Sequence, residues 1–543
     1  MLDRIEPKWH HLAVCLLAAA LFLPFLGKVH LFDWDEINFA EAAREMLLTG
    51  NFTQVQINFQ PFFEKPPLFI WMQALSMKIF AVSEYAARFP NAVCGVISLS
   101  YLFFLGKRLK EITFAWWWVL LYAGSFLPHF YFKSGIIDPW FNLFIFVAVT
   151  SLPIIAARQY EFEKLNRWAV IGGCSLGLAV LTKGPVAIIL TGIVVGVMAI
   201  WKRQHLDWNR RLLSYFLISF LTVASSWFVL ETIVNGPGFV LEFLNYQIRL
   251  FTTQDAGHGG PFFYHFVVLL LGCFPASTLL LSKPIQSTGY HFDDVFRKWM
   301  WVLLWVVLIV FSIVETKILH YSSLAYFPLT YLAAEKLKSW LGGQQPGKLV
   351  PGFLLGFGLL FGIILIMLPV AGKNLDVILP YIKDQFAVAN LKADVHWSYV
   401  GCSIGFFYLL GVFGFWYFTK QQERSKAWLI LLVINIMTIQ HLMNSIVPKI
   451  EKITQGAAIE FYEEKAEEDC VVEVLGFKSY AHLFYTNKTL DPGEPILSQE
   501  ELLSKPTNRK VYFAARMNKA EKFKNELGLK EIKRKNGFVF LEK

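Results

Sequence analysis

The sequence predicts an α-helical polytopic membrane protein with a small soluble α/β domain at its C-terminal end. Of the 543 residues, 55% are apolar and only 17% are charged, whereas about a quarter of the residues of a soluble domain are charged. The apolar residues form runs of about 17–25, the length that a bilayer core requires. Barrel strands would instead give short alternating segments. Residues 446–543 differ from the rest because they are rich in charge.

About thirteen transmembrane helices are predicted from the apolar runs. The first run has no small-residue cleavage pattern after it, so we interpret it as a retained span. The predicted spans lie near residues 11–29, 88–106, 113–132, 138–156, 168–182, 184–201, 212–233, 262–281, 299–314, 318–335, 349–371, 399–418 and 427–444.

Loop charge decides how the apolar segment 66–83 lies. When this segment is placed in the membrane interface rather than across the bilayer, most Lys and Arg residues fall in alternate loops on one side. If it crossed, every later loop would change sides and the asymmetry would largely vanish. The positive-inside rule then predicts a cytoplasmic N-terminus and interfacial helices in an outer loop at 30–87. It also predicts an outer loop at 234–261 and an outer C-terminal domain.

The C-terminal residues 446–543 predict a small α/β domain. Short alternating runs typical of strands occur in "CVVEVLGF", "KVYFAAR" and "GFVFLEK". The intervening "KAEKFKNEL" has the pattern of a helix. Residues 1–445 are accordingly predicted to form the transmembrane domain.

The short outer loops contain unusually polar residues. A charge at membrane depth costs upward of about 2.5 kcal/mol, so it is rarely without a role. Converging Lys and Arg side chains fit a phosphate or pyrophosphate group, and carboxylates beside them fit a general base that activates a hydroxyl. The residues concerned are Asp35, Glu36, Arg44, Glu64, Lys65, Asp138, Lys183, His258, Lys317, His320 and Tyr321.

Most of these residues also have a purely structural explanation. The alternatives are helix capping for Asp35, Glu36 and Asp138, snorkelling to lipid headgroups for Lys65, a helix-end position for Lys183, and a structural or loop-ordering role for His258 and His320. Single residues therefore favour a site only weakly, and the prediction depends on their shared side of the membrane.

Several motifs occur in a recognisable order. They are "DEINFAEAAREMLLTGNF", "FFEKPPLFIW", "KSGIIDP", "LTKGP", "GHGGPFFY" and "TKILHYSSLAYFPL". In these motifs the chain resembles the GT-C glycosyltransferases, which use polyprenyl-phosphate sugars. It is most similar to the bacterial branch of the aminoarabinose (lipid A) transferases, which is related to the protein O-mannosyltransferases. The resemblance extends over essentially the whole chain and implies the GT-C fold with a periplasmic C-terminal domain.

The resemblance also implies roles for individual residues. The catalytic carboxylates would be Asp35, Glu36 and Asp138, and the donor phosphate would be held by Lys65, Arg44 and Tyr321. From their place in the outer loops, we expect Lys183 and Lys317 to join them. Glu64 and His258 resemble a carboxylate–histidine pair that can hold zinc in that branch. Two ligands are few for a zinc site, and we expect that the reaction requires no metal or other cofactor.

Two positions depart from the lipid A transferases. Asn38 stands where those proteins carry Arg, and the stretch "LHYSS" replaces their Leu-Pro-Thr-Tyr. The sugar transferred and the acceptor, which is lipid A, a glycan or a protein, therefore stay open.

The sequence thus predicts an inverting glycosyltransferase of the bacterial inner membrane. We expect its partners to be a polyprenyl-phosphate sugar donor, an envelope acceptor and membrane lipid. The net charge of +9 lies in short loops and is explained by membrane topology, so nucleic acid is not expected as a partner.

Two other functions are alternatives. A polyprenyl-lipid flippase or transporter would show inverted repeats and broken helices near the bilayer midplane, and we find neither in the sequence. An O-antigen ligase or polymerase would have a long, late outer loop with paired Arg residues, whereas residues 372–398 contain no Arg.

Overall fold

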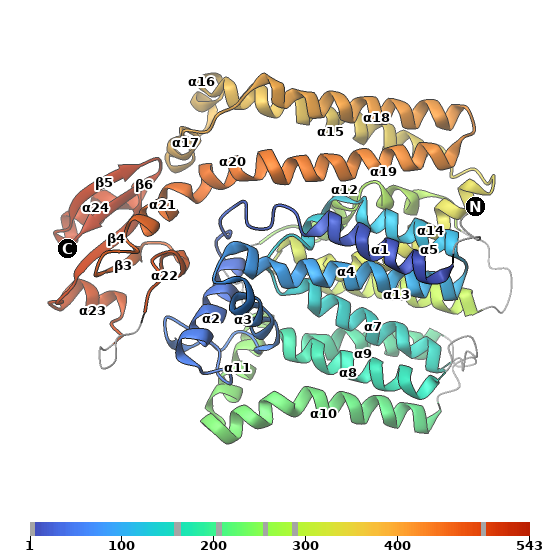
Figure 1. Ribbon diagram of the computed structural model, residues 1–543, viewed down its shortest axis with the longest axis horizontal. Helices are drawn as coiled ribbons and strands as arrows, with labels where there is room; N and C mark the ends of the chain where they lie inside the picture. Colours follow the sequence, from blue (N-terminus) through green and yellow to red (C-terminus); the bar gives the residue numbers. More distant parts are fainter. Residues whose placement is uncertain (1–5, 157–163, 202–208, 253–258, 285–291, 490–495) are drawn as a thin grey trace.

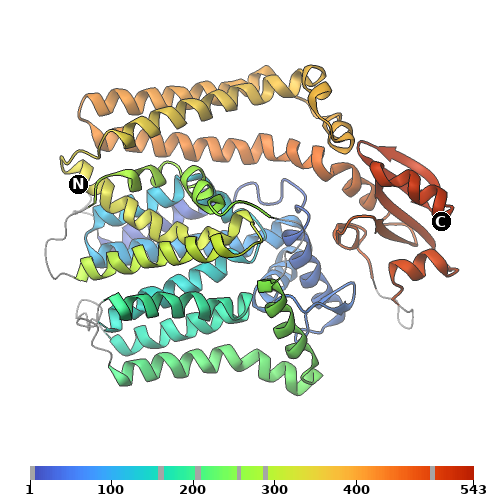
Figure 2. The same ribbon diagram turned by 180° about the vertical axis from the view of Figure 1, so that it is seen from behind.

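The computed structural model of the chain describes residues 6–156, 164–201, 209–252, 259–284, 292–489 and 496–543. Figure 1 shows long helices that run nearly parallel to one another, with the N-terminus at one end and the C-terminal domain at the other. The view from behind shows the same separation (Figure 2). The two termini therefore lie at opposite ends of the helical bundle, as an odd number of spans requires.

A helix occupies each predicted span. By length and composition, eight helices in the described part of the chain are able to cross a membrane. The multi-pass prediction is thus confirmed, while the number of about thirteen spans stays a prediction. The bundle helices are α1 (Pro7–Phe22), α4 (Glu84–Leu109), α5 (Ile112–Ala123), α7 (Asp138–Ala156), α8 (Leu165–Lys183), α9 (Val186–Trp201), α10 (Arg210–Asn235), α12 (Tyr264–Gly272), α13 (Phe292–Ile313), α14 (Tyr326–Leu341), α15 (Leu349–Lys373), α18 (Ser403–Lys420) and α19 (Arg424–His441).

Shorter helices connect these elements. They are α6 (Phe126–Tyr131), α11 (Gly238–Thr252), α16 (Leu375–Ile378) and α17 (Gln385–Leu391), with short 3-10 helices at η2 (Ala276–Leu281), η3 (Leu319–Ala325), η4 (Leu379–Tyr381) and η5 (Tyr399–Cys402). Helices α11, α16 and α17 lie at the end of the bundle nearer the C-terminal domain (Figure 1).

Helix α8 packs closely between α7 and α10 because its contact positions are glycines. A Cβ atom at Gly173 would lie 2.1 Å from the Phe216 carbonyl oxygen of α10, and one at Gly172 would lie 1.9 Å from Ser151 Oγ of α7. Small residues of this kind let membrane helices approach closely. The close packing brings the first residue of α7, Asp138, beside the last residue of α8, Lys183.

The predicted outer loop 30–87, called the outer loop below, folds into two helices and a tight hairpin. Helix α2 (Asp35–Thr49) is followed by strands β1 (Gln56–Ile57) and β2 (Gln60–Pro61), and the segment 66–83 forms α3 (Leu68–Phe80). Helix α3 has 13 residues, fewer than the roughly 20 that a span needs. Both helices lie at the end of the bundle rather than within it (Figure 1), as the prediction of interfacial helices requires; their place in the membrane interface stays a prediction.

The last bundle helix continues well beyond residue 446, the predicted start of the soluble domain. After α19 the chain stays helical through η6 (Leu442–Ile446), α20 (Val447–Glu451), η7 (Lys452–Gly456) and α21 (Ala457–Glu464), where η6 and η7 are π-helical turns. The composition changes near 446 because the helix leaves its apolar surroundings, but its hydrogen bonding continues. The domain fold itself begins after α21.

The C-terminal domain contains a four-stranded sheet in the order β3-β4-β6-β5. Strand β3 is parallel to β4, and the remaining pairs are antiparallel. The elements are β3 (Cys470–Leu475), α22 (Ala481–Tyr485), α23 (Gln499–Ser504), β4 (Lys510–Arg516), α24 (Met517–Leu527), β5 (Lys530–Lys535) and β6 (Phe538–Glu542). The predicted α/β domain and its three alternating strands are confirmed.

A buried ion pair joins the outer loop to the bundle. Arg88 of α4 binds the Glu36 carboxylate in a bidentate manner, with Nε–Oε1 and Nη2–Oε2 distances of 2.9 and 2.7 Å. The same guanidinium donates to the carbonyl oxygens of Leu26, Val29 and His30. One side chain therefore holds both the chain that leaves α1 and the first turn of α2.

We expect Arg88→Ala to destabilise the protein by about 3–5 kcal/mol, because it leaves the Glu36 carboxylate buried without its partner. The midpoint of thermal unfolding in detergent measures this change. Arg108→Ala is the matched control, since it removes an exposed guanidinium from the same helix and should shift the midpoint far less. Equal midpoint shifts in both variants would contradict the prediction.

Candidate active site

A cavity of about 270 Å³ opens at the end of the bundle that carries α2 and α3. Its walls come from the outer loop, the start of α7, the end of α8, α11 and η3. The lining residues are Phe32, Asp33, Trp34, Asp35, Glu36, Phe39, Glu64, Lys65, Ile136, Ile137, Lys183, Tyr246, Ile318, His320 and Tyr321. Residues far apart in the chain thus meet in one place, and several of them are residues that the sequence predicts as site residues.

Helix α2 places Asp35 at the cavity. Acidic residues in a first helical turn interact favourably with the helix dipole, and Gly50, with φ +70°, ends the helix by donating its N–H to Met46. Burial raises the pKa of Asp35, but the hydrogen bond and charge of His320 and the nearby Lys65 outweigh it, so this pKa lies below its usual value. The Asp35 carboxylate is therefore ionised and faces the cavity.

His320 lies between two carboxylates. Its Nε2 atom is 3.3 Å from Asp35 Oδ2 and 3.6 Å from Asp138 Oδ2. The other oxygen of Asp138, Oδ1, lies 2.6 Å from Lys183 Nζ. The side chain of Asp138 is only 3% exposed, so its charge is compensated by this lysine rather than by water. Asp35, His320, Asp138 and Lys183 thus form one continuous polar chain.

Two lysines bring positive charge to the cavity wall. Lys183 Nζ lies 5.1 Å from the centre of the Tyr321 ring, and Lys65 Nζ lies 5.7 Å from the centre of the Tyr246 ring of α11. Burial lowers the pKa of Lys65, while the carboxylate of Glu64 opposes that effect. Such partly desolvated ammonium groups are well placed for an anionic ligand, because a phosphate would strengthen their charged form.

The structure places Arg44 away from this cavity. Its guanidinium binds Glu41 at 2.6 and 2.7 Å and donates to the carbonyl of Lys488 in the C-terminal domain. At about 100° per residue, positions nine apart on an α-helix point to opposite faces, so Asp35 and Arg44 diverge. The predicted phosphate contact of Arg44 is not formed in this arrangement.

Lys317 also points elsewhere. Its Nζ donates to the carbonyl oxygens of Phe311, Ser312 and Val314 at the end of α13, which is the usual way for a lysine to complete a helix C-terminus. The predicted phosphate contact of Lys317 is therefore replaced by a capping role. Glu36, a predicted catalytic carboxylate, has its two oxygens bound to Arg88.

The proposed zinc pair is incomplete in the part of the chain that the structure describes. Glu64 lines the cavity, but His258 lies outside the described residues. Among the described residues, no three His, Cys, Asp or Glu side chains converge in a way that could hold a metal ion. A zinc site at Glu64 and His258 stays a prediction.

The residues at or beside the site that the prediction lacks include three that matter for the argument. They are Arg88, Tyr246 and Gln455, whose side-chain amide binds the backbone of Leu31 and Asp33. Arg88 stands at the start of the predicted span 88–106, and a charge in that position indicates a buried partner. Tyr246 and Gln455 had no comparable signal.

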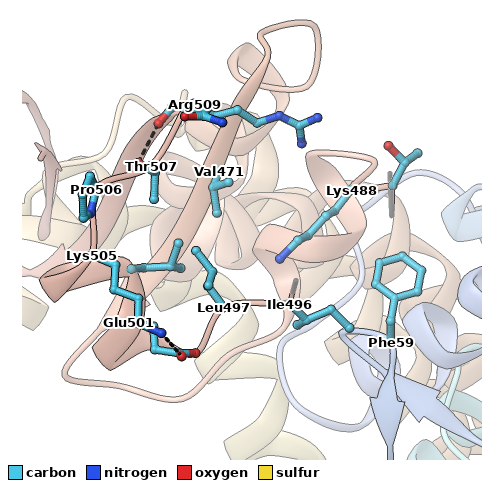
Figure 3. Close-up of a pocket in the computed structure, with 13 residues that line it drawn as sticks. Phe59, Val471, Lys488, Ile496, Leu497, Glu501, Lys505, Pro506, Thr507 and Arg509 are labelled. Atoms are coloured by element: carbon cyan, nitrogen blue, oxygen red, sulfur yellow. Dashed lines mark hydrogen bonds and ion pairs between the residues drawn. The ribbon is translucent and has the colours of Figure 1, made fainter. Parts of the chain in front are cut away.

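A second cavity, of about 450 Å³, lies in the C-terminal domain beside the outer-loop hairpin. Figure 3 shows that Lys488, Lys505 and Arg509 line it together with apolar side chains. Lys505 Nζ is bound to Glu501 at 2.6 Å, and Lys488 Nζ donates to Asn58 at 3.0 Å. The residues that line it include none of the predicted site residues, whereas the cavity at Asp35 contains several of them.

Comparison with known proteins gives related sequences. The family model of dolichyl-phosphate-mannose-protein mannosyltransferases matches residues 64–229. An undecaprenyl phosphate-alpha-4-amino-4-deoxy-L-arabinose arabinosyl transferase of Shewanella sediminis is 29% identical over 60% of this chain, and the match spans 59% of that protein. Its namesake from Pectobacterium carotovorum is 26% identical over 73% of this chain and 74% of its own length.

Solved structures show the same fold. The crystal structure of ArnT from Cupriavidus metallidurans bound to undecaprenyl phosphate matches with a TM-score of 0.73 at 17% identity, over 99% of this chain and 98% of that chain. Its apo state gives a TM-score of 0.75 at 16% identity, over 98% and 97%. The chain is thus similar in sequence to the aminoarabinose transferases over part of its length, and it has the fold of the ArnT structures over nearly its whole length.

Proposed function

We propose that the chain is an inverting glycosyltransferase that moves a sugar from an undecaprenyl-phosphate-linked donor to an envelope acceptor. The observation that carries this proposal is the single cavity in which the ionised Asp35 faces Lys65 and Lys183. The names of the related proteins favour 4-amino-4-deoxy-L-arabinose as the sugar, and the resemblance of the motifs favours lipid A as the acceptor. The reaction takes place at the periplasmic face of the bacterial inner membrane, with the N-terminus in the cytoplasm.

Lys65 and Lys183 bind the phosphate of the donor and stabilise the charge that develops when it leaves. The polyprenyl chain lies along neighbouring apolar surface, where Leu75 and Ile79 of α3 and Ile248 of α11 are 62%, 64% and 65% exposed. Asp138 keeps the ammonium of Lys183 at the cavity wall through their 2.6 Å contact.

The acceptor oxygen attacks the anomeric carbon on the side opposite the phosphate. A new C–O bond forms while the bond from the anomeric carbon to the phosphate oxygen breaks, and its electron pair leaves with the polyprenyl phosphate. In-line attack inverts the anomeric configuration. A hydroxyl acceptor gives its proton to Asp35, which His320 holds in place, whereas an ionised phosphate acceptor needs no base.

A flippase or an O-antigen ligase is less well supported. A transporter binds its substrate near the bilayer midplane between broken helices, whereas the charged groups described here meet at one end of the bundle. The motifs and the fold are also those of a transferase family rather than of a ligase.

We expect Asp35→Asn to lower kcat by about 100- to 10,000-fold for a hydroxyl acceptor, since the amide cannot take the proton. Transfer from a synthetic undecaprenyl-phosphate-linked sugar, followed by mass spectrometry of the product, measures the effect. Asp376→Asn, an exposed change in α16, is the matched control and should leave kcat unchanged. Transfer by Asp35→Asn at the wild-type rate would refute the proposed role.

Removal of either cavity lysine should weaken donor binding. A hydrogen bond to a charged group is worth about 1.5–3 kcal/mol, so Lys65→Ala and Lys183→Ala should each raise the Kd for undecaprenyl phosphate about 10- to 100-fold. A binding titration with the lipid in detergent measures this change. Lys317→Ala should lower thermal stability and leave the Kd nearly unchanged. A large rise in the Kd for this variant would show that Lys317 contacts the phosphate.

We expect the transfer to proceed without a divalent cation, because the two lysines already supply positive charge beside the phosphate. Assay of protein treated with a strong chelator should give the wild-type rate. A rate that falls on chelation and returns with zinc would show that the metal is required.

A further inference from the structure

The backbone just before Asp35 is in an unusual conformation. Trp34 has φ +94° and ψ −100°, a region that side chains larger than glycine's rarely adopt. No side chain caps the start of α2 at this position. A conformation of this kind persists only where the surrounding structure imposes it, and it occurs often at functional sites.

The side-chain amide of Gln455 holds this segment. Its Nε2 donates to the carbonyl of Leu31 at 2.8 Å, and its Oε1 accepts the N–H of Asp33 at 3.1 Å. Leu31 also donates its N–H to the Tyr485 hydroxyl at 2.7 Å. The amide thus closes a ring of two hydrogen bonds on the residues that lead into Trp34, although Leu31 and Gln455 are 424 positions apart in the chain.

Gln455 belongs to the π-helical turn η7 in the long helix that runs from α19 into the C-terminal domain. Figures 1 and 2 show this helix leading from the bundle to that domain. A π-turn adds a residue to the helical turn and so alters the direction of the side chains around it, and such turns occur frequently at functional sites. Glu451, one turn earlier, binds His30 at 3.0 Å, so the same helix contacts the segment twice.

We propose that Gln455 is a positioning residue for the glycosyl transfer: it holds the Trp34 turn so that the Asp35 carboxylate faces His320 and the cavity lysines. This inference rests on the proposed function. Without the two hydrogen bonds Trp34 relaxes to negative φ, and the carboxylate at the start of α2 turns with it. Lys65 and Lys183 do not depend on this segment, so donor binding persists.

Gln455→Leu tests the proposal, since it keeps a side chain of similar volume and removes the hydrogen bonds to Leu31 and Asp33. We expect kcat to fall on the order of 100-fold, as a displacement of about 1 Å can cause, while the KM and Kd for the donor stay near the wild-type values. Thr454→Ala, an exposed change in the same turn, should leave kcat unchanged. Wild-type kcat in Gln455→Leu, or an equal loss of donor binding, would overturn the proposal.

Gln455→Glu supplies a second measurement that a general loss of stability would not mimic. A protonated Glu can donate to Leu31 and accept from Asp33 as Gln does, whereas ionised Glu cannot donate. The titratable residues that share contacts with this position are Asp33, Glu451, His30 and Tyr485, and the two carboxylates among them favour the protonated form of the new side chain. We therefore expect the ratio of variant to wild-type kcat to rise as the pH is lowered from about 7 to about 5. A ratio that does not change with pH would count against the proposal.

Amide hydrogen exchange separates this proposal from the proposed function. The Asp33 N–H, which donates to Gln455, should exchange faster in Gln455→Leu whether or not the protein transfers sugar. If the exchange rate is unchanged, the positioning role is refuted. If exchange accelerates while the wild-type protein transfers no sugar, the contact is upheld and the proposed function fails.

Discussion

The site depends on the buried pair of Arg88 and Glu36. Within the first outer loop the chain must leave α1, turn, and start α2, and this stretch has many backbone groups at the membrane surface. The guanidinium of Arg88 satisfies three of its carbonyl oxygens, while Glu36 accepts the N–H of Phe32 and of Gly135. Burial raises the pKa of Glu36, but the effect of Arg88 and of these N–H groups is larger, so the pKa lies below its usual value. The carboxylate next to Asp35 is therefore fixed as a structural anion.

These different roles explain why two acidic residues, Asp35 and Glu36, are adjacent in the chain just after the first predicted span. Glu36 is fully engaged in holding the loop, so Asp35 is the carboxylate left to face the cavity. The remainder of α2 is buried as far as Met46. On its far side the helix meets the C-terminal domain through Arg44 and Lys488. Helix α2 thus lies between the cavity at Asp35 and the C-terminal domain. Through this helix the domain contributes to the geometry of the site.

The acidic and basic side chains around the cavity compensate one another's charges. Asp138 neutralises Lys183, His320 bridges two carboxylates, and Lys65 is partly desolvated near Glu64. In the proposed reaction, a donor phosphate would meet ammonium groups already held in place, with little reorganisation needed as negative charge develops. The same arrangement places the reacting groups at the end of the bundle, beside apolar surface that suits a lipid tail.

The sequence by itself determined the membrane class, the α/β domain, a helix capped by Asp35 and Glu36, and the prediction that one face gathers Asp35, Lys65, Asp138, Lys183 and His320. Apolar run length and loop charge are local properties, so they can be read along the chain. The tertiary structure alone decided that Arg44 and Lys317 turn away and that Arg88 and Gln455 hold the site. These outcomes depend on helix phase and on contacts between distant segments. A charge at the start of an apolar run indicates that Arg88 needs a partner, but the linear pattern does not identify that partner.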